Sequence, residues 1–275
     1  MKRIAVLGPK GTYSDIACKK YIGEMNLSCE VDYYPSIFKA AEAVKEDTIA
    51  ILPFENTLDG FVMESMDRII DRNLHILSQV KLDIDFAFVS NAKSIDEVKN
   101  CYVQYKAYGQ CLDFISKYGF NIHTTQSNME SMERVIASNP SFGAVVPIHA
   151  LTEQQFALEI RHIADSPSNE TRFFVVADSP VEEYRTEALE ASVVITSVVD
   201  RPGILFDILK NFHDLDINLK SIMSRPMKTE MGKYWFYLEC SLLNEQRDRL
   251  DSLIRRFSQQ KEFIVRILGI YNKVR

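Results

Sequence analysis

The last third of the chain constrains the fold most, because its strand and helix signals come in one characteristic order. Apolar residues lie on one helical face over 203–212, and Leu250, Leu253, Ile254 and Phe257 recur at helical spacing. β-branched and aromatic runs predict strands over 191–199, 217–222, 233–240 and 263–270. Together these segments have the order βαββαβ, which is that of a ferredoxin-like domain.

Through about residue 180, short apolar runs alternate with helical patterns, which predicts an α/β fold. The predicted strands cover 3–7, 48–52, 85–89, 143–146 and 172–177. The predicted helices cover 13–21, 37–44, 62–70, 107–115 and 128–136. The segment 178–186 is polar and turn-prone, so we expect a linker there between a domain of residues 1–180 and one of residues 188–275.

Composition narrows the classes of protein. The 275 residues carry a formal net charge of −6, so the surface field disfavours nucleic acid and any anion site has to be local. The apolar stretch at residues 4–7 is too short for a signal peptide, and none approaches the roughly 20 residues of a membrane span. We therefore expect a cytoplasmic, soluble chain with neither nucleic acid nor membrane as a partner.

The cysteines and histidines point to neither disulfides nor a metal. The five cysteines are an odd number without a C-x-x-C pair, which predicts reduced, buried thiols. The five histidines are scattered and form no H-E-x-x-H motif. We expect no metal and no cofactor.

Three polar clusters lie beside predicted strands, and the first runs from Gly8 to Ser14. It stands between a strand and a helix, where free backbone N–H groups and the positive helix end favour an anion. It matches neither the Walker pattern nor G-x-G-x-x-G, so a nucleotide site is disfavoured. The alternative is a tight turn followed by a Thr or Ser N-cap.

The other two clusters cover residues 53–60 and 169–174. The first of these presents the Asn56 amide and the Thr57 hydroxyl where open α/β sheets bind ligands, although a plain turn is the alternative. The second places the Thr171 hydroxyl beside the Arg172 guanidinium at the start of a strand. A threonine can donate a proton and an arginine can hold a carboxylate, but an edge-strand threonine beside a surface ion pair is the alternative.

The motifs G-P-K-G-T-Y-S, P-F-E-N-T-L-D-G and N-E-T-R-F-F-V-V, followed by a ferredoxin-like domain, resemble monofunctional bacterial prephenate dehydratase over nearly the whole chain. The resemblance implies a periplasmic-binding-protein-like catalytic domain whose two α/β lobes, roughly 1–80 with 160–180 and 81–159, surround a cleft. It also implies a C-terminal ACT domain that binds L-phenylalanine as effector. The effector-binding residues are then Pro202, Gly203, Ile204, Leu205, Asn218, Leu219, Ser224, Arg225 and Pro226.

The same resemblance implies a reaction in which prephenate loses carbon dioxide and water to give phenylpyruvate. Thr171 is the implied donor to the departing hydroxyl, and such a donor contributes on the order of 10²–10⁴-fold. Arg172, or the backbone of the first cluster, is expected to hold the pyruvyl carboxylate, while Asn56 and Thr57 orient the ring substituents. The expected substrate-binding residues are Gly11, Thr12, Ser14, Glu55 and Phe173.

The chain departs from the family pattern in two places. Many members carry S-H-P-Q-A-L-A-Q-C where this chain has V-Q-Y-K-A-Y-G-Q-C over 103–111, so no catalytic histidine is assigned there. Met223 replaces the carboxylate of E-S-R-P, ahead of Ser224, Arg225 and Pro226. Because that change removes a polar group at the effector site, we expect weaker or altered control by phenylalanine.

Two other functions stay open. An arogenate dehydratase would use the same Thr171, whereas a nonenzymatic amino-acid sensor would have no need of its hydroxyl. The resemblance also implies a homodimer or a dimer of dimers, and the sequence does not distinguish between them.

Overall fold

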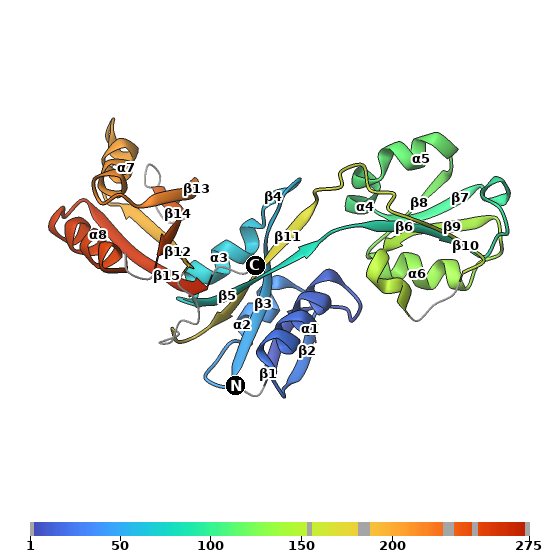
Figure 1. Ribbon diagram of the computed structural model, residues 1–275, viewed down its shortest axis with the longest axis horizontal. Helices are drawn as coiled ribbons and strands as arrows, with labels where there is room; N and C mark the ends of the chain where they lie inside the picture. Colours follow the sequence, from blue (N-terminus) through green and yellow to red (C-terminus); the bar gives the residue numbers. More distant parts are fainter. Residues whose placement is uncertain (1–2, 153–155, 181–187, 228–233, 244–246, 273–275) are drawn as a thin grey trace.

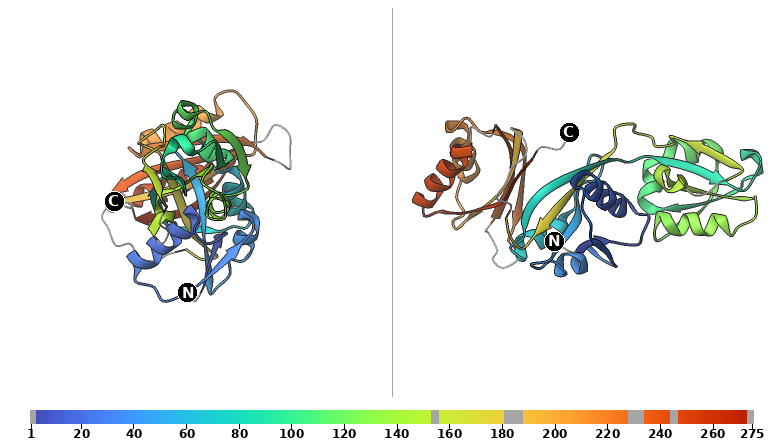
Figure 2. Two further views of the ribbon diagram at one scale, coloured as in Figure 1. Left: turned by 90° about the vertical axis from the view of Figure 1, so that its right-hand side faces the viewer. Right: turned by 60° about the horizontal axis from the view of Figure 1, so that its bottom comes forward.

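The computed structural model describes residues 3–152, 156–180, 188–227, 234–243 and 247–272. Three sheets form three bodies in a row, with the first lobe between the second lobe and the C-terminal domain (Figure 1 and Figure 2). The predicted α/β class is confirmed, and so is the ferredoxin-like order of the C-terminal domain.

The first lobe is built on a mixed sheet in the order β2-β1-β3-β11-β5, with β4 beside β3. Its strands are β1 (Arg3–Leu7), β2 (Glu30–Tyr34), β3 (Thr48–Asn56), β4 (Gly60–Phe61), β5 (His75–Asp83) and β11 (Glu170–Ala177). Its helices are α1 (Tyr13–Met25), α2 (Ile37–Glu42) and α3 (Met63–Asp71). α1 packs on one face of the sheet through Ala17 and Cys18, and α2 and α3 pack on the other.

The second lobe has a five-stranded sheet in the order β10-β6-β9-β7-β8. Its strands are β6 (Phe86–Ser90), β7 (Asn100–Gln104), β8 (Asn121–Thr125), β9 (Phe142–Pro147) and β10 (Leu158–Arg161). Its helices are η1 (Ile95–Glu97), α4 (Tyr105–Gln110), α5 (Leu112–Tyr118), α6 (Asn128–Ile136) and η2 (Ile148–Thr152). The chain enters this lobe between β5 and β6 and leaves it between β10 and β11, so two crossings join the lobes.

The C-terminal domain has a four-stranded antiparallel sheet in the order β13-β14-β12-β15. Its elements are β12 (Ala188–Ser197), α7 (Ile204–Asp214), β13 (Asn218–Pro226), β14 (Tyr234–Leu243), α8 (Arg247–Gln259) and β15 (Phe263–Asn272). The two helices pack on one face of this sheet through Ile208, Phe212, Leu253 and Phe257.

The other face of the C-terminal sheet packs against the first lobe. Tyr237, Leu268 and Tyr271 belong to one apolar cluster with Phe54 and Phe174. Burial of each such side chain contributes about 1.5–3 kcal/mol, so this contact holds the two domains together in a defined arrangement.

The structure differs from the predicted elements in several places. The helix expected over 107–115 is two helices that meet at Cys111, and the strands β2, β4, β5, β7, β8 and β10 were not predicted. Strands such as β8 are largely exposed and polar, so they lack the apolar alternation that marks a strand. Most of the predicted linker lies outside the described residues.

The remaining expectations from composition can be compared with the described part of the chain. Four of the five cysteines are buried and Cys29 is partly exposed, and all five are free. Among the described residues, no helix is long and apolar enough to cross a membrane. Within the same ranges, no group of three His, Cys, Asp or Glu side chains is arranged to hold a metal ion.

Candidate active site

Thr171 and Asn56 form a hydrogen-bonded pair at the ends of two neighbouring strands. They are register partners in β11 and β3, and the Asn56 amide donates to Thr171 Oγ1 at 2.9 Å. Asn56 Oδ1 accepts the backbone N–H groups of Leu58 and Asp59 at 2.9 and 3.0 Å, which fixes the orientation of the amide. Since Thr171 Oγ1 already accepts this bond, its own proton is free to be donated to a ligand.

Asn169 and Thr57 extend this pair into a network of neutral groups. Asn169 is 2% exposed, and its Oδ1 accepts from Asn56 at 2.7 Å. Its amide donates to Gln110 Oε1 of the second lobe at 3.0 Å. Thr57 donates to the backbone oxygen of Ser168 at 3.2 Å and accepts from the backbone N–H of Glu170 at 3.0 Å.

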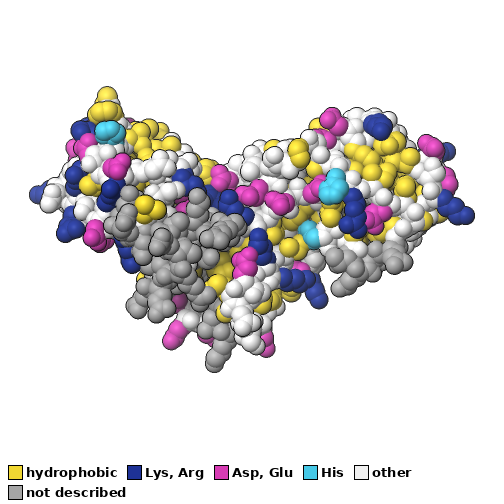
Figure 3. Space-filling model, viewed as in Figure 1, with side chains coloured by type: hydrophobic (Ala, Val, Ile, Leu, Met, Phe, Trp, Pro, Cys, Tyr) yellow, Lys and Arg dark blue, Asp and Glu magenta, His cyan; other side chains and the backbone are white. Residues whose placement is uncertain are grey.

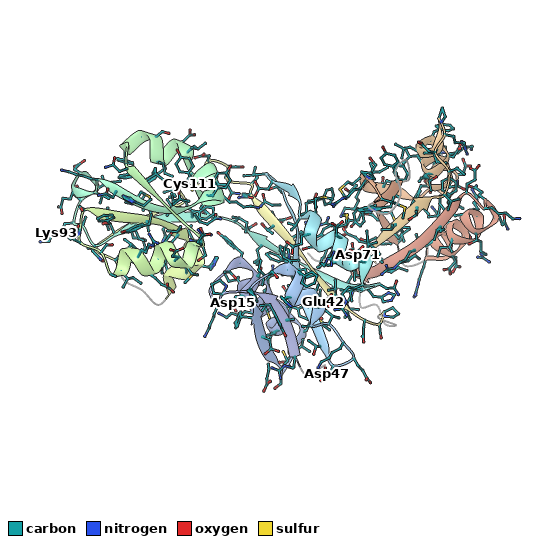
Figure 4. All side chains as sticks on the ribbon, turned by 180° about the vertical axis from the view of Figure 1, so that it is seen from behind. Asp15, Glu42, Asp47, Asp71, Lys93 and Cys111 are labelled. Carbon is teal, nitrogen blue, oxygen red and sulfur yellow. The ribbon has the colours of Figure 1, made fainter. Side chains whose placement is uncertain are left out.

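The first polar cluster lies at the amino end of α1 and beside the second lobe. Thr12 occupies the N-cap position, but its hydroxyl donates to the backbone oxygen of Pro9 at 2.9 Å instead of capping the helix. The Gly11 N–H donates to Asp15 Oδ2 at 2.8 Å, and Ser14 is 5% exposed. Figure 4 marks Asp15 on α1 and Cys111 in the second lobe, on the sides where the two lobes face each other.

The same loop makes contacts with the second lobe. A Cβ on Gly11 would lie 2.9 Å from the sulfur of Met129 in α6, so the backbone approaches that helix closely. The Tyr13 hydroxyl donates to the backbone oxygen of Asp85 at 2.8 Å, and its ring packs edge-on against His149 at 4.6 Å between centroids. Burial lowers the pKa of His149 to about 4, so the imidazole is neutral at physiological pH.

Arg172 and Glu55 lie on the opposite face of the sheet from Thr171 and Asn56. Successive side chains of a strand point to opposite faces, so adjacent residues cannot both face one ligand from a regular strand. The Arg172 guanidinium donates to Glu55 Oε2 at 2.7 Å and forms a fork with the Glu239 carboxylate of the C-terminal domain. This placement differs from the expectation that Arg172 holds a substrate carboxylate.

Phe173 is on the same face as Thr171 but is only 1% exposed. It packs beneath α1 with Ile51, Val80 and Val175. The structure thus brings Asn56, Thr57 and Thr171 together. It turns Arg172 and Glu55 away from them and buries Phe173 in the core.

A cavity of about 300 Å³ separates this strand pair from the C-terminal sheet, and its walls include Asn56, Thr57, Arg172, Lys220 and Glu239. On the face seen in Figure 3, acidic and basic side chains adjoin in the middle of the molecule, over the junction of the first lobe and the C-terminal domain. The junction therefore has charged side chains at its rim, and inside it the buried Arg172 and Glu239 lie beside an apolar cluster.

Sequence reasoning did not single out Asn169 or Gln110 as site residues. Asn169 stands in the quoted motif N-E-T-R-F-F-V-V, and Gln110 is one of the few residues of the second-lobe family pattern that this chain retains. The retained Gln110 could have indicated a site residue, because its side chain accepts a hydrogen bond from Asn169 of the other lobe.

The expected effector residues fall into three groups in the C-terminal domain. Residues 202–205 lie at the start of α7, and residues 224–226 end β13. The strands β12 and β13 both run antiparallel to β14, so both of these groups lie at the same end of the sheet. Asn218 and Leu219 begin β13 and therefore lie at its other end.

A two-lobed α/β domain with neutral donors at the lobe junction, carrying a docked βαββαβ domain, is typical of a ligand-binding unit with an added small domain. Residues 4–181 match the family described as prephenate dehydratase, and residues 192–248 match the ACT domain. The chain belongs to the prephenate dehydratase family, and the resemblance inferred from its motifs is confirmed.

Individual proteins agree with this assignment. The prephenate dehydratase of Methanocaldococcus jannaschii is 28% identical over 265 residues, covering 96% of this chain and 95% of that protein. The crystal structure of the Staphylococcus aureus Mu50 prephenate dehydratase has a TM-score of 0.83 and 27% identity, covering 99% of this chain and all of the other. The Arthrobacter aurescens prephenate dehydratase in complex with L-Phe shares the fold, with a TM-score of 0.82, 24% identity and coverage of 98% and 90%.

Proposed function

We propose that this chain converts prephenate to phenylpyruvate, carbon dioxide and water. The observation that carries the proposal is the Asn56–Thr171 hydrogen bond at 2.9 Å, which leaves a hydroxyl proton to donate at the junction of the two lobes. The family assignment supports the reaction class.

The reaction requires a leaving hydroxide and a departing carboxylate. The bond between the ring and its carboxylate breaks, the electron pair moves through the ring, and the carbon–oxygen bond on the opposite side breaks. Thr171 donates a hydrogen bond to that oxygen as the carbon–oxygen bond breaks, which stabilises the developing hydroxide, and the hydroxide takes its proton from water. A donor of this kind contributes on the order of 10²–10⁴-fold.

The neutral character of the proposed site suits the carboxylate that must leave. A cation paired with it would stabilise the ground state and slow its loss. Asn56, Thr57 and Asn169 are uncharged, and Arg172 points to the other face. We place the pyruvyl carboxylate near the amino end of α1, where the helix dipole favours an anion.

Substrate comparison tests this proposal against the two alternatives. We expect purified chain to form phenylpyruvate from prephenate with a higher kcat/KM than it forms phenylalanine from arogenate. The reverse preference would identify an arogenate dehydratase. No turnover of either substrate, together with binding of phenylalanine, would identify a sensor.

We further propose that the ACT domain binds L-phenylalanine and that the chain forms a homodimer or a dimer of dimers. The related Arthrobacter structure contains L-Phe. β13 is an edge strand of the C-terminal sheet, and it carries effector residues at both ends. A second copy seated against this edge would bring Asn218 of one protomer toward the α7 loop of the other.

Light scattering during size-exclusion chromatography tests the assembly. We expect two or four times the mass of one chain, with the larger species favoured by phenylalanine. A monomer at micromolar concentration, with or without phenylalanine, would overturn this part of the proposal.

A further inference from the structure

Arg172 is a buried cation on the face of β11 opposite Thr171, and its side-chain hydrogen bonds go to Glu55, Gln79 and Glu239. It also borders the cavity that Asn56 and Thr57 line. Only 7% of it is exposed, and its guanidinium donates to both oxygens of Glu239 in β14, with 2.8 Å between Nη2 and Oε2. Glu239 is 1% exposed. Burial lowers the pKa of Arg172. The hydrogen bonds and the charge of Glu239 raise it by more than burial lowers it, so the pKa is above the usual value and the side chain stays positively charged.

The two domains share an apolar contact in addition to this ion pair. Around it, Phe54, Phe174 and Tyr271 already form part of a continuous apolar contact, and the guanidinium lies 5.4 Å from the Phe54 ring centroid. Burying two charges carries a desolvation cost that an apolar pair of similar size would avoid. What the two-point fork adds is geometry, because it fixes both the distance and the direction between β11 and β14.

The fork acts on the part of β11 that carries the proposed active site. In the strand register Thr171 pairs with Asn56, and the next pair is Arg172 with Glu55 on the opposite face. Directly afterwards the register shifts, between Arg172 and Phe173. At such a bulge the strand ladder is interrupted, so side-chain contacts help to set where neighbouring side chains point.

A second path reaches Arg172 from the edge strand β13. A register shift leaves Lys220 without a register partner in β14, and its side chain contacts Glu190 of β12. Glu190 accepts from Gln79 Nε2 of β5 at 2.6 Å, and Gln79 Oε1 accepts from Arg172 Nη1 at 3.4 Å. Contacts from three strands of the C-terminal sheet therefore converge on one arginine.

We propose that Arg172 is a positioning residue. Its ion pair with Glu239 of the C-terminal domain fixes the position of β11, so that the Thr171 hydroxyl lies within hydrogen-bond distance of the substrate. The inference rests on the proposed function and adds to it a residue of the C-terminal sheet that touches no substrate. Catalysis in the first lobe then depends directly on how that sheet is seated.

The test measures prephenate turnover by the full chain as wild type, Glu239→Gln, Arg172→Lys and the double variant. We expect each single change to lower kcat on the order of 10- to 100-fold, as for a small misplacement of a reacting group, with KM within about threefold. The kcat of the double variant should be no lower than that of the less active single variant, because both changes remove the same ion pair.

Arg266→Gln is the matched control at the same interface. Arg266 of β15 donates to the backbone oxygens of Leu74 and Ile70 at 2.8 and 3.0 Å, away from β11, so we expect its kcat to stay within about twofold of wild type. The emission of Trp235, the chain's single tryptophan and a residue buried at this interface, checks that each variant is folded. Should Glu239→Gln unfold, Glu239→Asp carries the same prediction.

Three results would overturn the inference. The first is an unchanged kcat in the folded Glu239 variant, and the second is an equal loss of kcat in Arg266→Gln. The third is a raised KM with unchanged kcat in Arg172→Lys, which would make Arg172 a substrate ligand. A wild type that forms no phenylpyruvate would instead overturn the proposed function itself, and the inference with it.

Discussion

At the scale of single residues, a threonine hydroxyl is a weak acid, so its use as a donor depends on the neighbouring group that sets the direction of its O–H bond. Asn56 supplies that control in this chain. Its oxygen is held by two backbone N–H groups, so its amide faces Thr171 as a donor and leaves the threonine proton for the substrate.

Asn56→Asp should reverse the direction of this hydrogen bond. A carboxylate cannot donate, so Thr171 would give its proton to Asp and not to the leaving oxygen. We expect kcat for prephenate to fall on the order of 10²–10³-fold while the chain stays folded. Asp59→Asn changes the charge by one on the same turn and should leave kcat near wild type; an active Asn56→Asp variant would contradict the proposed role.

His149 should make the stability of the lobe junction depend on pH. Its Nε2 is buried without a hydrogen-bond partner among the described residues, and burial lowers its pKa to about 4. Between about pH 6.5 and 4 the unfolded chain binds the proton and the folded chain does not, so the free energy of unfolding falls as pH falls. We expect about 1–2 kcal/mol from this group, because the ring is partly exposed.

Urea unfolding at several pH values tests this expectation. His149→Gln should flatten the slope between pH 6.5 and 4 relative to wild type. If the free energy of unfolding depends on pH equally in wild type and His149→Gln, the fold does not lower the pKa of this imidazole.

From the sequence, Thr171 was expected as a donor on the family resemblance, and Asn56 as a polar group that follows a strand; their direct pairing across β11 and β3 was not predicted. The sequence did not reveal that Arg172 faces the C-terminal domain, since that depends on the strand pleat and on which sheet covers the far face. The link from Gln110 to Asn169 spans 59 residues, so no local pattern could predict it.

At the scale of strands and helices, β15 packs against β5 at a glycine. A Cβ on Gly269 would lie 2.1 Å from the backbone oxygen of Ile76, and a backbone atom cannot move aside cheaply. We expect Gly269→Ala to lower the free energy of unfolding by about 1–3 kcal/mol, as overpacking does. Chemical unfolding followed by circular dichroism and by Trp235 emission measures the change.

Gly109→Ala provides the matched comparison. Gly109 lies in α4 with no heavy atom within 4 Å of its ideal Cβ, so the same methyl group meets open space there. We expect an effect near zero or a slight stabilisation, since alanine is the better helix former. Equal losses in the two variants would argue against close packing of β15 on β5.

Met223 of β13 should alter control by phenylalanine. It is partly buried and packs against the apolar cluster shared by the first lobe and the C-terminal sheet. We expect Met223→Glu to change the phenylalanine concentration for half-inhibition by more than about threefold, whereas Met223→Gln adds polarity without charge and separates the two effects. Ordinary micromolar inhibition of the wild type, unchanged by Met223→Glu, would rule this out.

Elements with a strong amphipathic pattern were predictable from sequence, and those without it were not. The helices α7 and α8 place regular apolar faces on their sheet, and both were expected within a few residues of where they lie. β2 and β8 are mostly exposed or half-exposed along their length, so their strand state comes from pairing with β1 and β7 rather than from local preference.

At the scale of the whole molecule, the C-terminal domain is seated on the sheet that carries the proposed active site (Figure 1). Each domain follows from its own sequence pattern, but their docking depends on side chains such as Phe54 and Tyr237, which lie far apart in the chain. This arrangement connects the C-terminal domain to Arg172, the residue that follows Thr171 in β11.

The measurement that tests the central claim most directly is phenylpyruvate formation from prephenate by wild type and Thr171→Val. Valine keeps the branched shape suited to a strand and removes only the donor. With both proteins folded by circular dichroism, we predict activity in the wild type and a loss of kcat on the order of 10²–10⁴-fold in the variant. Full activity in Thr171→Val would contradict the account, because the hydrogen bond to the leaving oxygen would then come from another group.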